Sequence, residues 1–531
     1  MATPKSRWCG VLVGLSLIVS GCVGTDERAA PASIGVEELV AQADAVPTPR
    51  VEWVPCSEDK LRRYECARVS VPLDYTRLDG PTIELAVVRQ RALDPARRIG
   101  TLFTAAGGPG NSGIGWAADS EMFPGELSRR FDVVTFDQRG IGRSAPVRCF
   151  PNSAAQQAFW DDMIVPPTDV AQQRATEDSS RRLAAGCAEH GGELIDHLTT
   201  ADAARDLDLL RRAVGDPKLT YEGGSYASYL GIVYGSMFPE RVRALQLSSI
   251  VDPESYTNAT PTDIENTAQG TEAVLAEFLR LCAEAGAPRC GFAGTGNDSA
   301  QVRARDTALL DRSSLAPIQV GQGPESVLAT HSQIVQAHAM LLYDPRRGWP
   351  ALAALLTELE LGAAGNPDVV RDVMAAVGLT GGFLDSFVAI SCADNSFARQ
   401  PHRWPEFAAE SARNAPVFGP FWLYLRQPCA TWDAPEDGYP QRYTGPWAQR
   451  SSVPALLLNN RFDPVTPESS ARRTAQAMGT ARLVVVTDGY GHEPTGECVT
   501  TVRQRYLIDL EVPDPGTTCA LGQAPFAEVM N

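Results

Sequence analysis

Short apolar runs alternate with amphipathic helical patterns through the first 250 residues and again after residue 450. Such runs predict buried strands at 82–88, 99–103, 131–136, 218–221, 242–250, 453–458 and 481–486. Residues 201–214 instead place Leu207, Leu210 and Val214 at helical spacing, and Thr200 is a suitable N-cap. Strands that alternate with helices predict a mostly parallel sheet flanked by helices, an α/β fold.

The alternation stops in the middle of the chain. From about residue 254 to residue 450 the pattern becomes helical and alanine-rich, as in 272–285 and 351–361. An insertion of this size and position predicts a helical cap over a site on the sheet. The predicted organisation is a leader at 1–22, a flexible tether at 23–50, a first core part at 51–253, the cap at 254–450 and a second core part at 451–531.

The leader has the pattern of an export signal. Lys5 and Arg7 precede an apolar run from Val11 to Val19, which is about half the roughly 20 residues needed to span a bilayer. Val19-Ser20-Gly21-Cys22 then matches a bacterial lipobox, which predicts lipid attachment at Cys22 and a place on the outer face of the cell membrane. A simple secretory signal is the alternative.

The composition excludes few classes of function. The formal net charge is −17 and 44% of residues are hydrophobic. An acidic surface repels phosphate backbones, so nucleic acid is not an expected partner. The sequence leaves the oligomeric state open.

Cysteine usage fits an exported chain. Twelve cysteines less Cys9 and Cys22 leave ten, an even number that predicts five disulfides. Metal binding is the competing use, but Cys-x-x-Cys and His-rich spacings are absent from the sequence, so no metal is expected. The sequence does not fix the connectivity; the spacing favours the nearest-neighbour pairs Cys56–Cys66, Cys149–Cys187, Cys282–Cys290, Cys392–Cys429 and Cys498–Cys519.

A nucleophile motif stands between a predicted strand and a predicted helix. Gly223-Gly224-Ser225-Tyr226-Ala227 follows the strand at 218–221 and precedes a helix that ends before Pro239. A serine on a sharp strand-to-helix turn is the nucleophile elbow of α/β-hydrolases. Ala227 stands where that motif usually has glycine. The context predicts Ser225 as the nucleophile of an α/β-hydrolase fold.

The other two members of a triad follow in the expected chain order. In α/β-hydrolases the acid and then the histidine come after the serine. Asp463 lies just past the strand at 455–459, and His492, the only histidine after Asp463, lies just past the last strand. Asp488 is a rival acid, but it lies before the final turn and only four residues from His492. We therefore predict Ser225, Asp463 and His492 as the catalytic triad.

A glycine-rich turn can supply the oxyanion site. Gly107-Gly108-Pro109-Gly110 follows the strand that ends near Phe103. The backbone N–H near Gly108 and that of Tyr226 are the predicted donors to the oxyanion, each typically worth about 10²–10³ in rate. A phosphate loop is disfavoured because no Gly-Lys-Ser/Thr follows.

Four motifs together resemble the proline iminopeptidase group of α/β-hydrolase serine peptidases. They are the Gly-Gly-Pro-Gly turn, Asp137-Gln138-Arg139-Gly140-Ile141-Gly142-Arg143-Ser144, the serine motif and Asn460-Arg461-Phe462-Asp463-Pro464-Val465-Thr466-Pro467. The nearer resemblance, over about residues 50–519, is to the actinobacterial secreted tripeptidyl aminopeptidases and related cell-envelope lipoprotein proteases and esterases. The sequence departs from that pattern in two places. Ala105-Ala106 precedes the glycine turn where the family usually has His or Asn-Pro, and Glu222 occupies a position that is usually apolar in the family.

The resemblance and the residues together imply acyl transfer without a cofactor. The leading hypothesis is an aminopeptidase that releases short N-terminal peptides, with Asp394 or Glu222 holding the substrate's free amine. A cell-envelope carboxylesterase or lipase with the same triad is the alternative. A lipid-anchored binding protein on an inactive hydrolase fold is less favoured, because binding alone does not require Ser225, Asp463 and His492 in that order.

Overall fold

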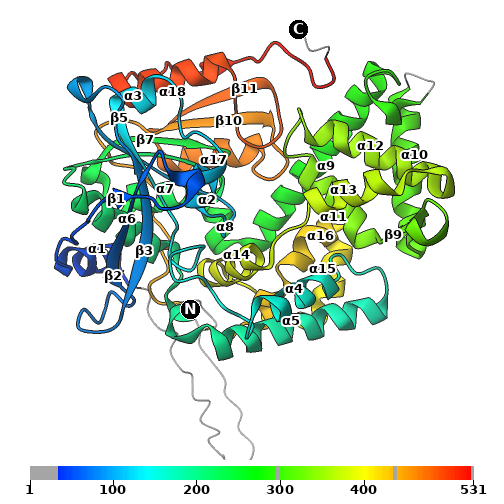
Figure 1. Cartoon of the computed structure of the whole chain (residues 1–531), viewed down its shortest axis with the longest axis horizontal. Coiled ribbons are helices and arrows are strands. Elements are labelled where there is room, and N and C mark those ends of the chain that lie inside the picture. Colours follow the sequence, from blue (N-terminus) through cyan, green and yellow to red (C-terminus); the bar gives the residue numbers. More distant parts are fainter. Residues whose placement is uncertain (1–33, 295–297, 435–438, 528–531) are drawn as a thin grey trace, which may run out of the picture.

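The computed structural model describes residues 34–294, 298–434 and 439–527. The predicted signal segment, including Cys22, lies outside these ranges. The α/β fold predicted from the sequence is confirmed: a ten-stranded sheet forms one half of the molecule, and a helical cap forms the other (Figure 1). Within the described ranges no single helix is long and apolar enough to span a bilayer, and one bent helix pair, 367–376 with 381–394, meets that criterion by length and composition only.

The sheet is antiparallel at one edge and parallel through its centre. Its order is β1-β2-β3-β5-β4-β6-β7-β10-β11-β12. All pairs from β5 to β12 are parallel, and the pairs among β1, β2, β3 and β5 are antiparallel. The strands are β1 (Val54–Pro55), β2 (Glu65–Pro72), β3 (Thr82–Gln90), β4 (Gly100–Ala105), β5 (Phe131–Phe136), β6 (Leu219–Gly224), β7 (Val242–Ser248), β10 (Leu456–Phe462), β11 (Arg482–Tyr490) and β12 (Thr518–Cys519).

Alternate side chains of the central strands enter two different cores. Leu102 of β4 packs on one face with the helices α2 (Gly113–Asp119), α3 (Glu126–Arg130) and α18 (Glu497–Asp509). The next residue, Phe103, packs on the other face with α6 (Thr200–Ala213), α7 (Tyr226–Met237) and α17 (Glu468–Met478). Both faces are therefore apolar, which is why the central strands read as continuous hydrophobic runs.

The N-terminal part of the described chain corrects the predicted tether. Helix α1 (Val36–Ala45) buries Leu39 and Ala43 and packs against α6 and α7. Arg212 fixes its end by donating to the carbonyl oxygen of Val46 at 2.7 Å. Apolar residues at helical spacing give this segment a face to bury, so it belongs to the core rather than to a spacer. The N-cap of α6 is also one residue earlier than predicted, at Thr199.

The cap consists of helices and one small hairpin. It contains α8 (Pro253–Asn258), α9 (Thr260–Ala285), α10 (Ser299–Leu315), α11 (His331–Leu341), α12 (Gly348–Leu361), α13 (Pro367–Ala376), α14 (Gly381–Asp394), α15 (Trp404–Ser411) and α16 (Phe418–Leu425), with strands β8 (Ile318–Val320) and β9 (Val327–Ala329). Figure 1 shows these helices stacked beside the sheet, so that the cap faces the carboxyl ends of the parallel strands.

Two helices that the predicted boundaries place in the core pack against the cap. They are α4 (Ser153–Asp162) and α5 (Val170–His190), which lie beside α14, α15 and α16 in Figure 1. Asp385 of α14 accepts hydrogen bonds from Gln156 at 2.6 Å and from Trp160 at 2.8 Å. An amphipathic helix can bury its apolar face against either neighbour, so the sequence pattern gave no reason to separate this pair from the core.

The disulfides match the pairing favoured by the spacing. All ten cysteines within the described ranges are bonded in five pairs, and in each pair a cysteine is bonded to the next cysteine along the chain. The pairs are Cys56–Cys66, Cys149–Cys187, Cys282–Cys290, Cys392–Cys429 and Cys498–Cys519. Two of these bridges lie within the cap, and Cys149–Cys187 ties the end of α5 to the loop before α4.

Candidate active site

Ser225 occupies the turn between β6 and α7 in a strained backbone conformation. Its φ is 58° and its ψ is −131°, a region that non-glycine residues rarely adopt. The turn is held by hydrogen bonds from Ser225 N to the Ser248 carbonyl oxygen at 3.0 Å and from Ser228 N to the Ser225 carbonyl oxygen at 2.8 Å. The conformation is that of a nucleophile elbow, which presents the serine at the carboxyl edge of the sheet.

The structure brings Asp463 and His492 together at the same edge. Asp463 directly follows β10, and His492 lies two residues after β11. His492 Nδ1 lies 3.0 Å from both carboxylate oxygens of Asp463. The carboxylate is buried and also accepts from the backbone N–H groups of Val465 at 3.0 Å and Thr466 at 2.9 Å. These bonds fix the carboxylate against the imidazole.

Asp488, the rival acid, forms its hydrogen bonds away from His492. Asp488 lies within β11, and its carboxylate accepts from the backbone N–H groups of Leu521 at 2.6 Å and Gly522 at 2.9 Å. It holds the C-terminal segment to the sheet. The acid that the structure places on His492 is therefore Asp463.

His492 is oriented toward the cavity that also contains Ser225. Its backbone N–H donates to the Tyr343 carbonyl oxygen at 2.7 Å, and the two rings meet edge to face at 5.0 Å. Among the described residues, its buried Nε2 has no hydrogen-bond partner. Ser225 and His492 both line one cavity. An imidazole with Nδ1 held by a carboxylate and Nε2 open to the nucleophile's cavity has the arrangement that general-base catalysis requires.

The pH dependence of catalysis follows from the surroundings of His492. Burial disfavours the protonated ring, but the Asp463 carboxylate and its hydrogen bond outweigh burial and raise the pKa above its usual value of 6.5. The base must be neutral, so kcat/KM is expected to increase with pH and to level off above that raised pKa. A kcat/KM profile from pH 5 to 9 checks this, and activity that is highest at pH 5 would contradict it.

The glycine turn after β4 lies directly against Ser225. A Cβ at Gly107 would come within 2.8 Å of the Ser225 Cβ, so only glycine fits there. Gly108 has a φ of 117°, which also favours glycine. Gly108 and Tyr226, the predicted oxyanion donors, line the same cavity as Ser225. The close approach places backbone N–H groups next to the nucleophile, where an oxyanion would form.

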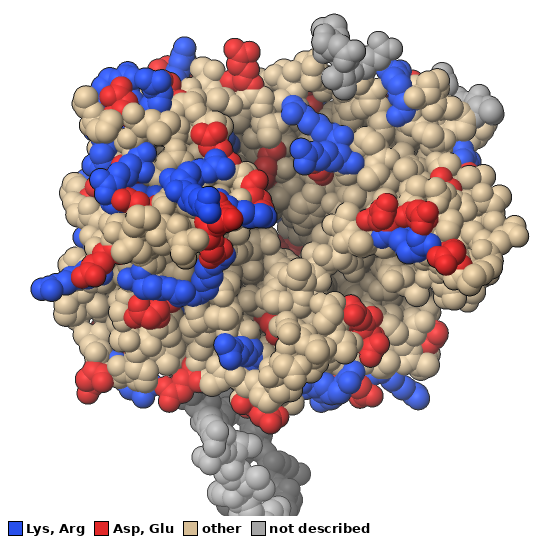
Figure 2. Space-filling model, in the orientation of Figure 1, with Lys and Arg blue, Asp and Glu red and all other residues tan. Residues whose placement is uncertain are grey.

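The cavity lies between the sheet and the cap and has a volume of about 530 Å³, within the range of small-molecule and peptide sites. Its floor is formed by Ser225, His492 and the glycine turn, and its roof by Phe383, Phe387 and Trp422 of the cap. Figure 2 shows a hollow on this face between the two halves of the molecule, with charged side chains of both signs around it.

The two predicted amine anchors lie elsewhere, and this corrects the prediction. Asp394 is buried and accepts from the backbone N–H of Thr200 at 2.7 Å and from its hydroxyl at 2.6 Å. Glu222 is buried in β6, where it accepts from the Thr104 hydroxyl at 3.2 Å. Burial raises the pKa of both carboxyls to about 7. Neither residue lines the cavity, so neither reaches a bound substrate.

Three other carboxylates line the cavity. Glu493 follows His492 and accepts from the Ser248 hydroxyl at 2.6 Å. Asp252 pairs with Arg473 at 2.7 Å. Asp263, near the start of α9, has a pKa raised to about 6, because burial outweighs the attraction of Arg426. Sequence motifs mark none of the three; the position of Glu493 next to the triad histidine was the one available signal.

Comparison with known proteins agrees with this geometry. Residues 102–341 match the family model described as alpha/beta hydrolase fold, and residues 415–519 match the model described as TAP-like protein. The tripeptidyl aminopeptidase of Streptomyces lividans is 27% identical over 492 residues, which cover 90% of this chain and 87% of the relative. Serine protease Hip1 of Mycobacterium tuberculosis is 28% identical over 542 residues, covering 96% of each chain.

An esterase-named relative is equally similar. Carboxylesterase B of Mycobacterium tuberculosis is 29% identical over 499 residues, covering 90% of this chain and 91% of the relative. The printed names of the relatives thus include both peptidases and an esterase, and they share most of their length with this chain. The chain has the α/β-hydrolase fold and a TAP-like C-terminal region, and it is a serine hydrolase of the peptidase or esterase kind.

Proposed function

We propose that this serine hydrolase is an aminopeptidase that releases short peptides from free N-termini. The observation that carries the proposal is the set of carboxylates in the wall of the capped cavity: Asp252, Asp263 and Glu493. These three carboxylates outnumber the one arginine in the described lining, Arg426, and such a balance favours a substrate that carries a positive charge, as a peptide amine does. The relatives named tripeptidyl aminopeptidase and serine protease support the same class of substrate.

The proposed reaction is acyl transfer through the triad. Ser225 Oγ attacks the peptide carbonyl carbon while His492 Nε2 takes the hydroxyl proton. The backbone N–H groups of Gly108 and Tyr226 stabilise the oxyanion. When the C–N bond breaks, His492 returns that proton to the leaving amine. Water then attacks the acyl-enzyme and His492 takes a proton from it. As the bond to Ser225 Oγ breaks, His492 returns this proton to Oγ, and the short peptide leaves as a carboxylic acid that ionises in solution.

Asp263 is the proposed anchor for the substrate amine. It belongs to the cap and lines the cavity, whereas Asp252 is already paired with Arg473. Its raised pKa means that burial opposes its charged form. A bound ammonium would offset that cost, because a buried charge gains most from a partner of opposite sign. The position of Asp263 would then fix how far the N-terminus lies from Ser225.

Acetylation of the substrate amine is expected to slow cleavage strongly. It removes the cation that the anchor carboxylate would hold, and losing one member of such a buried charge pair commonly costs about 2–5 kcal/mol. At about 1.4 kcal/mol per factor of ten, kcat/KM should fall by roughly 30-fold to several thousand-fold. The measurement compares free and acetylated forms of one short peptide amide.

The variant Asp263→Asn should erase most of this difference by weakening cleavage of the free-amine peptide. Asp372→Asn, an exposed position on α13, is the matched control and should leave the difference intact. Equal cleavage of free and acetylated peptides by the wild-type chain, with faster cleavage of a short-chain ester, would favour the carboxylesterase alternative. That alternative rests on the relative named carboxylesterase B and on the aromatic roof of the cavity.

We also propose that the chain is exported and held on the outer face of the cell membrane by a lipid on Cys22, with secretion as the alternative. Five disulfides support export, because such bonds form and persist in oxidising compartments. Relatives of this chain include a Streptomyces aminopeptidase and a mycobacterial serine protease. An exported peptidase would meet extracellular peptides as substrates.

A further inference from the structure

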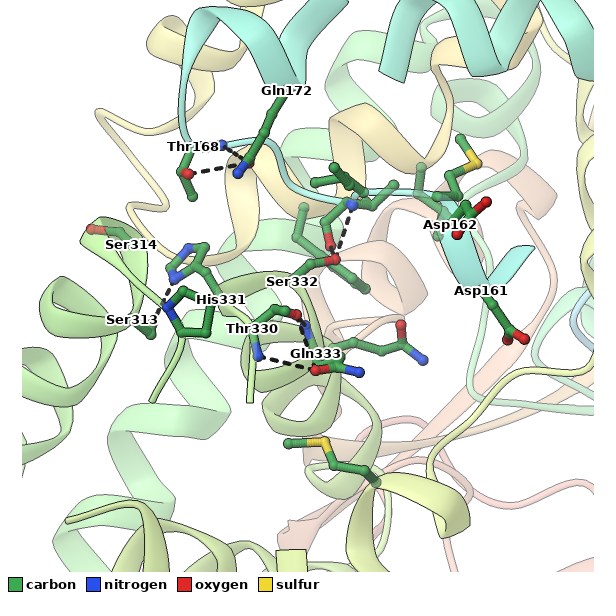
Figure 3. A pocket seen from close by; sticks show the side chains of 18 of the residues that line it. Asp161, Asp162, Thr168, Gln172, Ser313, Ser314, Thr330, His331, Ser332 and Gln333 are labelled. Atoms are coloured by element: carbon green, nitrogen blue, oxygen red, sulfur yellow. Dashed lines mark hydrogen bonds between the residues drawn. The ribbon is translucent and has the colours of Figure 1, made fainter. Parts of the chain in front are cut away.

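A second cavity of about 760 Å³ lies within the cap. Its walls come from the segment between α4 and α5, the first turns of α11, the end of α10 and the loop between α13 and α14. Figure 3 shows that several of its polar side chains are bonded to one another: Thr168 to Gln172, Ser313 to His331 and Thr330 to Gln333. These hydrogen bonds hold the polar side chains of the wall to one another.

A thin wall separates this second cavity from the active-site cavity. Gly378, Leu379, Leu384 and Leu425 line both of them. A residue that faces two cavities has no other packing layer behind it, so the wall is one residue thick at these positions. Leu379 lies in the short loop between α13 and α14 and is half-buried, whereas Leu384 and Leu425 belong to buried helix faces. Among the three leucines of the wall, Leu379 is therefore the one least held by packing.

The wall lies beside the glycine turn that packs against the nucleophile. Helix α14 begins at Gly381, directly after the wall loop, and its Phe383 carbonyl oxygen would lie 2.7 Å from a Cβ at Gly110. The wall loop thus adjoins the glycine turn. His492, which must protonate the leaving amine, is covered instead by Tyr343. Because the leaving amine must lie next to His492, the part of a peptide N-terminal to the cleaved bond would lie on the other side of the carbonyl, where the wall loop adjoins the glycine turn.

The charge of the second cavity fits an N-terminal amine. Asp161, Asp162 and Asp169 line it, and among the described residues that line it there is no lysine or arginine. Burial lowers the pKa of His331, so this ring adds no positive charge at neutral pH. An ammonium group would be attracted to this lining, whereas a carboxylate would be repelled.

We propose that the second cavity is a second peptide-binding site, which receives the N-terminal end of peptides too long for the active-site cavity, and that Leu379 limits their entry. The proposal rests on the proposed aminopeptidase function. It assigns Leu379 a role in specificity: the side chain decides the length of peptide that the enzyme releases. Short peptides stop at the wall, inside the cavity that Asp263 also lines, while longer ones must pass it.

The test uses alanine peptides of three to six residues with a free amine, each joined at its carboxyl end to aminomethylcoumarin. In Leu379→Gly, kcat/KM for the substrates with five- and six-residue peptides should rise by about 10-fold or more over wild type, as expected when steric exclusion from a pocket is relieved. The kcat/KM for the substrate with a three-residue peptide should change little. Leu379→Trp should instead lower kcat/KM for the five- and six-residue peptides. Leu328→Gly, an exposed position on β9 that lines neither cavity, is the control.

A second change separates opening of the wall from loosening of the fold. Ala316 is exposed and lines only the second cavity, so Ala316→Trp in the Leu379→Gly background should narrow that cavity and reverse much of the gain for the five- and six-residue peptides. Parallel changes at all lengths in Leu379→Gly would overturn the inference while leaving the aminopeptidase function in place. Absence of cleavage of every free-amine peptide by the wild-type chain would overturn both.

Discussion

Replacing Ser225 by alanine is expected to lower kcat by roughly four to six orders of magnitude. The substitution removes the attacking oxygen, so only binding and the backbone donors of Gly108 and Tyr226 would still accelerate the reaction. The Ser225 backbone is held by hydrogen bonds to Ser248 and Ser228, which do not involve the side chain. Turnover of a free-amine peptide amide by the purified variant gives the result, with thermal unfolding as the check on the fold.

The neighbouring serine provides the control. Ser228 is buried one turn into α7, and its hydroxyl accepts from Val251 N at 3.1 Å. Ser228→Ala removes the same hydroxyl group near the site and should retain most of the activity. Equal losses in both variants would point to a general disturbance of the elbow rather than to loss of a nucleophile.

Asp463→Asn is expected to lower kcat by about four orders of magnitude while leaving the fold intact. The carboxylate accepts from His492 Nδ1–H, which leaves Nε2 as the base. An amide can instead donate to Nδ1, and the ring proton then moves to Nε2, where it blocks proton transfer from Ser225. The side-chain oxygen of asparagine can still accept from Val465 and Thr466. The measurement is kcat with pH held above the His492 pKa.

Asp488→Asn is the matched control for this variant. Asp488 was the rival acid, but its carboxylate holds the backbone of Leu521 and Gly522. Its loss should reduce thermal stability modestly and leave kcat near the wild-type value. A larger loss of activity in Asp488→Asn than in Asp463→Asn would reverse the assignment.

The sequence predicted the sheet because its central strands are buried on both faces. Leu102 and Phe103 enter different cores, and so do Leu456 and Leu457, which produces continuous apolar runs. The triad could be predicted for a related reason. Parallel strands end at one edge, so residues just after β6, β10 and β11 must meet there, and chain order then distinguishes acid from base.

Burial of the polar groups could not be predicted in the same way. Glu222 directly precedes the serine motif and Asp394 lies two residues after Cys392, yet hydrogen bonds from Thr104 and Thr200 hold both carboxylates inside the structure. A motif reports the position of an acid along the chain but not what its carboxylate faces. Asp263, by contrast, carries no motif, and only the fold of the cap over the sheet brings it into the cavity.

The surface against which a helix packs could not be predicted from its own sequence pattern either. The patterns of α1 and α5 show an apolar face, but such a face can pack on the sheet, on the cap or on neither. The structure places α1 on the core, within the predicted tether, and α5 on the cap, within the predicted core. The competing surfaces come from residues more than a hundred positions away, so a local pattern cannot choose between them.

The most direct test of the central claim is covalent labelling with a fluorophosphonate, which reacts with activated serines. The account predicts one adduct per chain, located on Ser225 by mass spectrometry of the digested protein, with peptidase activity lost in proportion to labelling. Labelling should be absent in Ser225→Ala, and it should be slowed in wild type by a free-amine peptide. An adduct on another residue, or full activity in chains labelled at Ser225, would contradict the account.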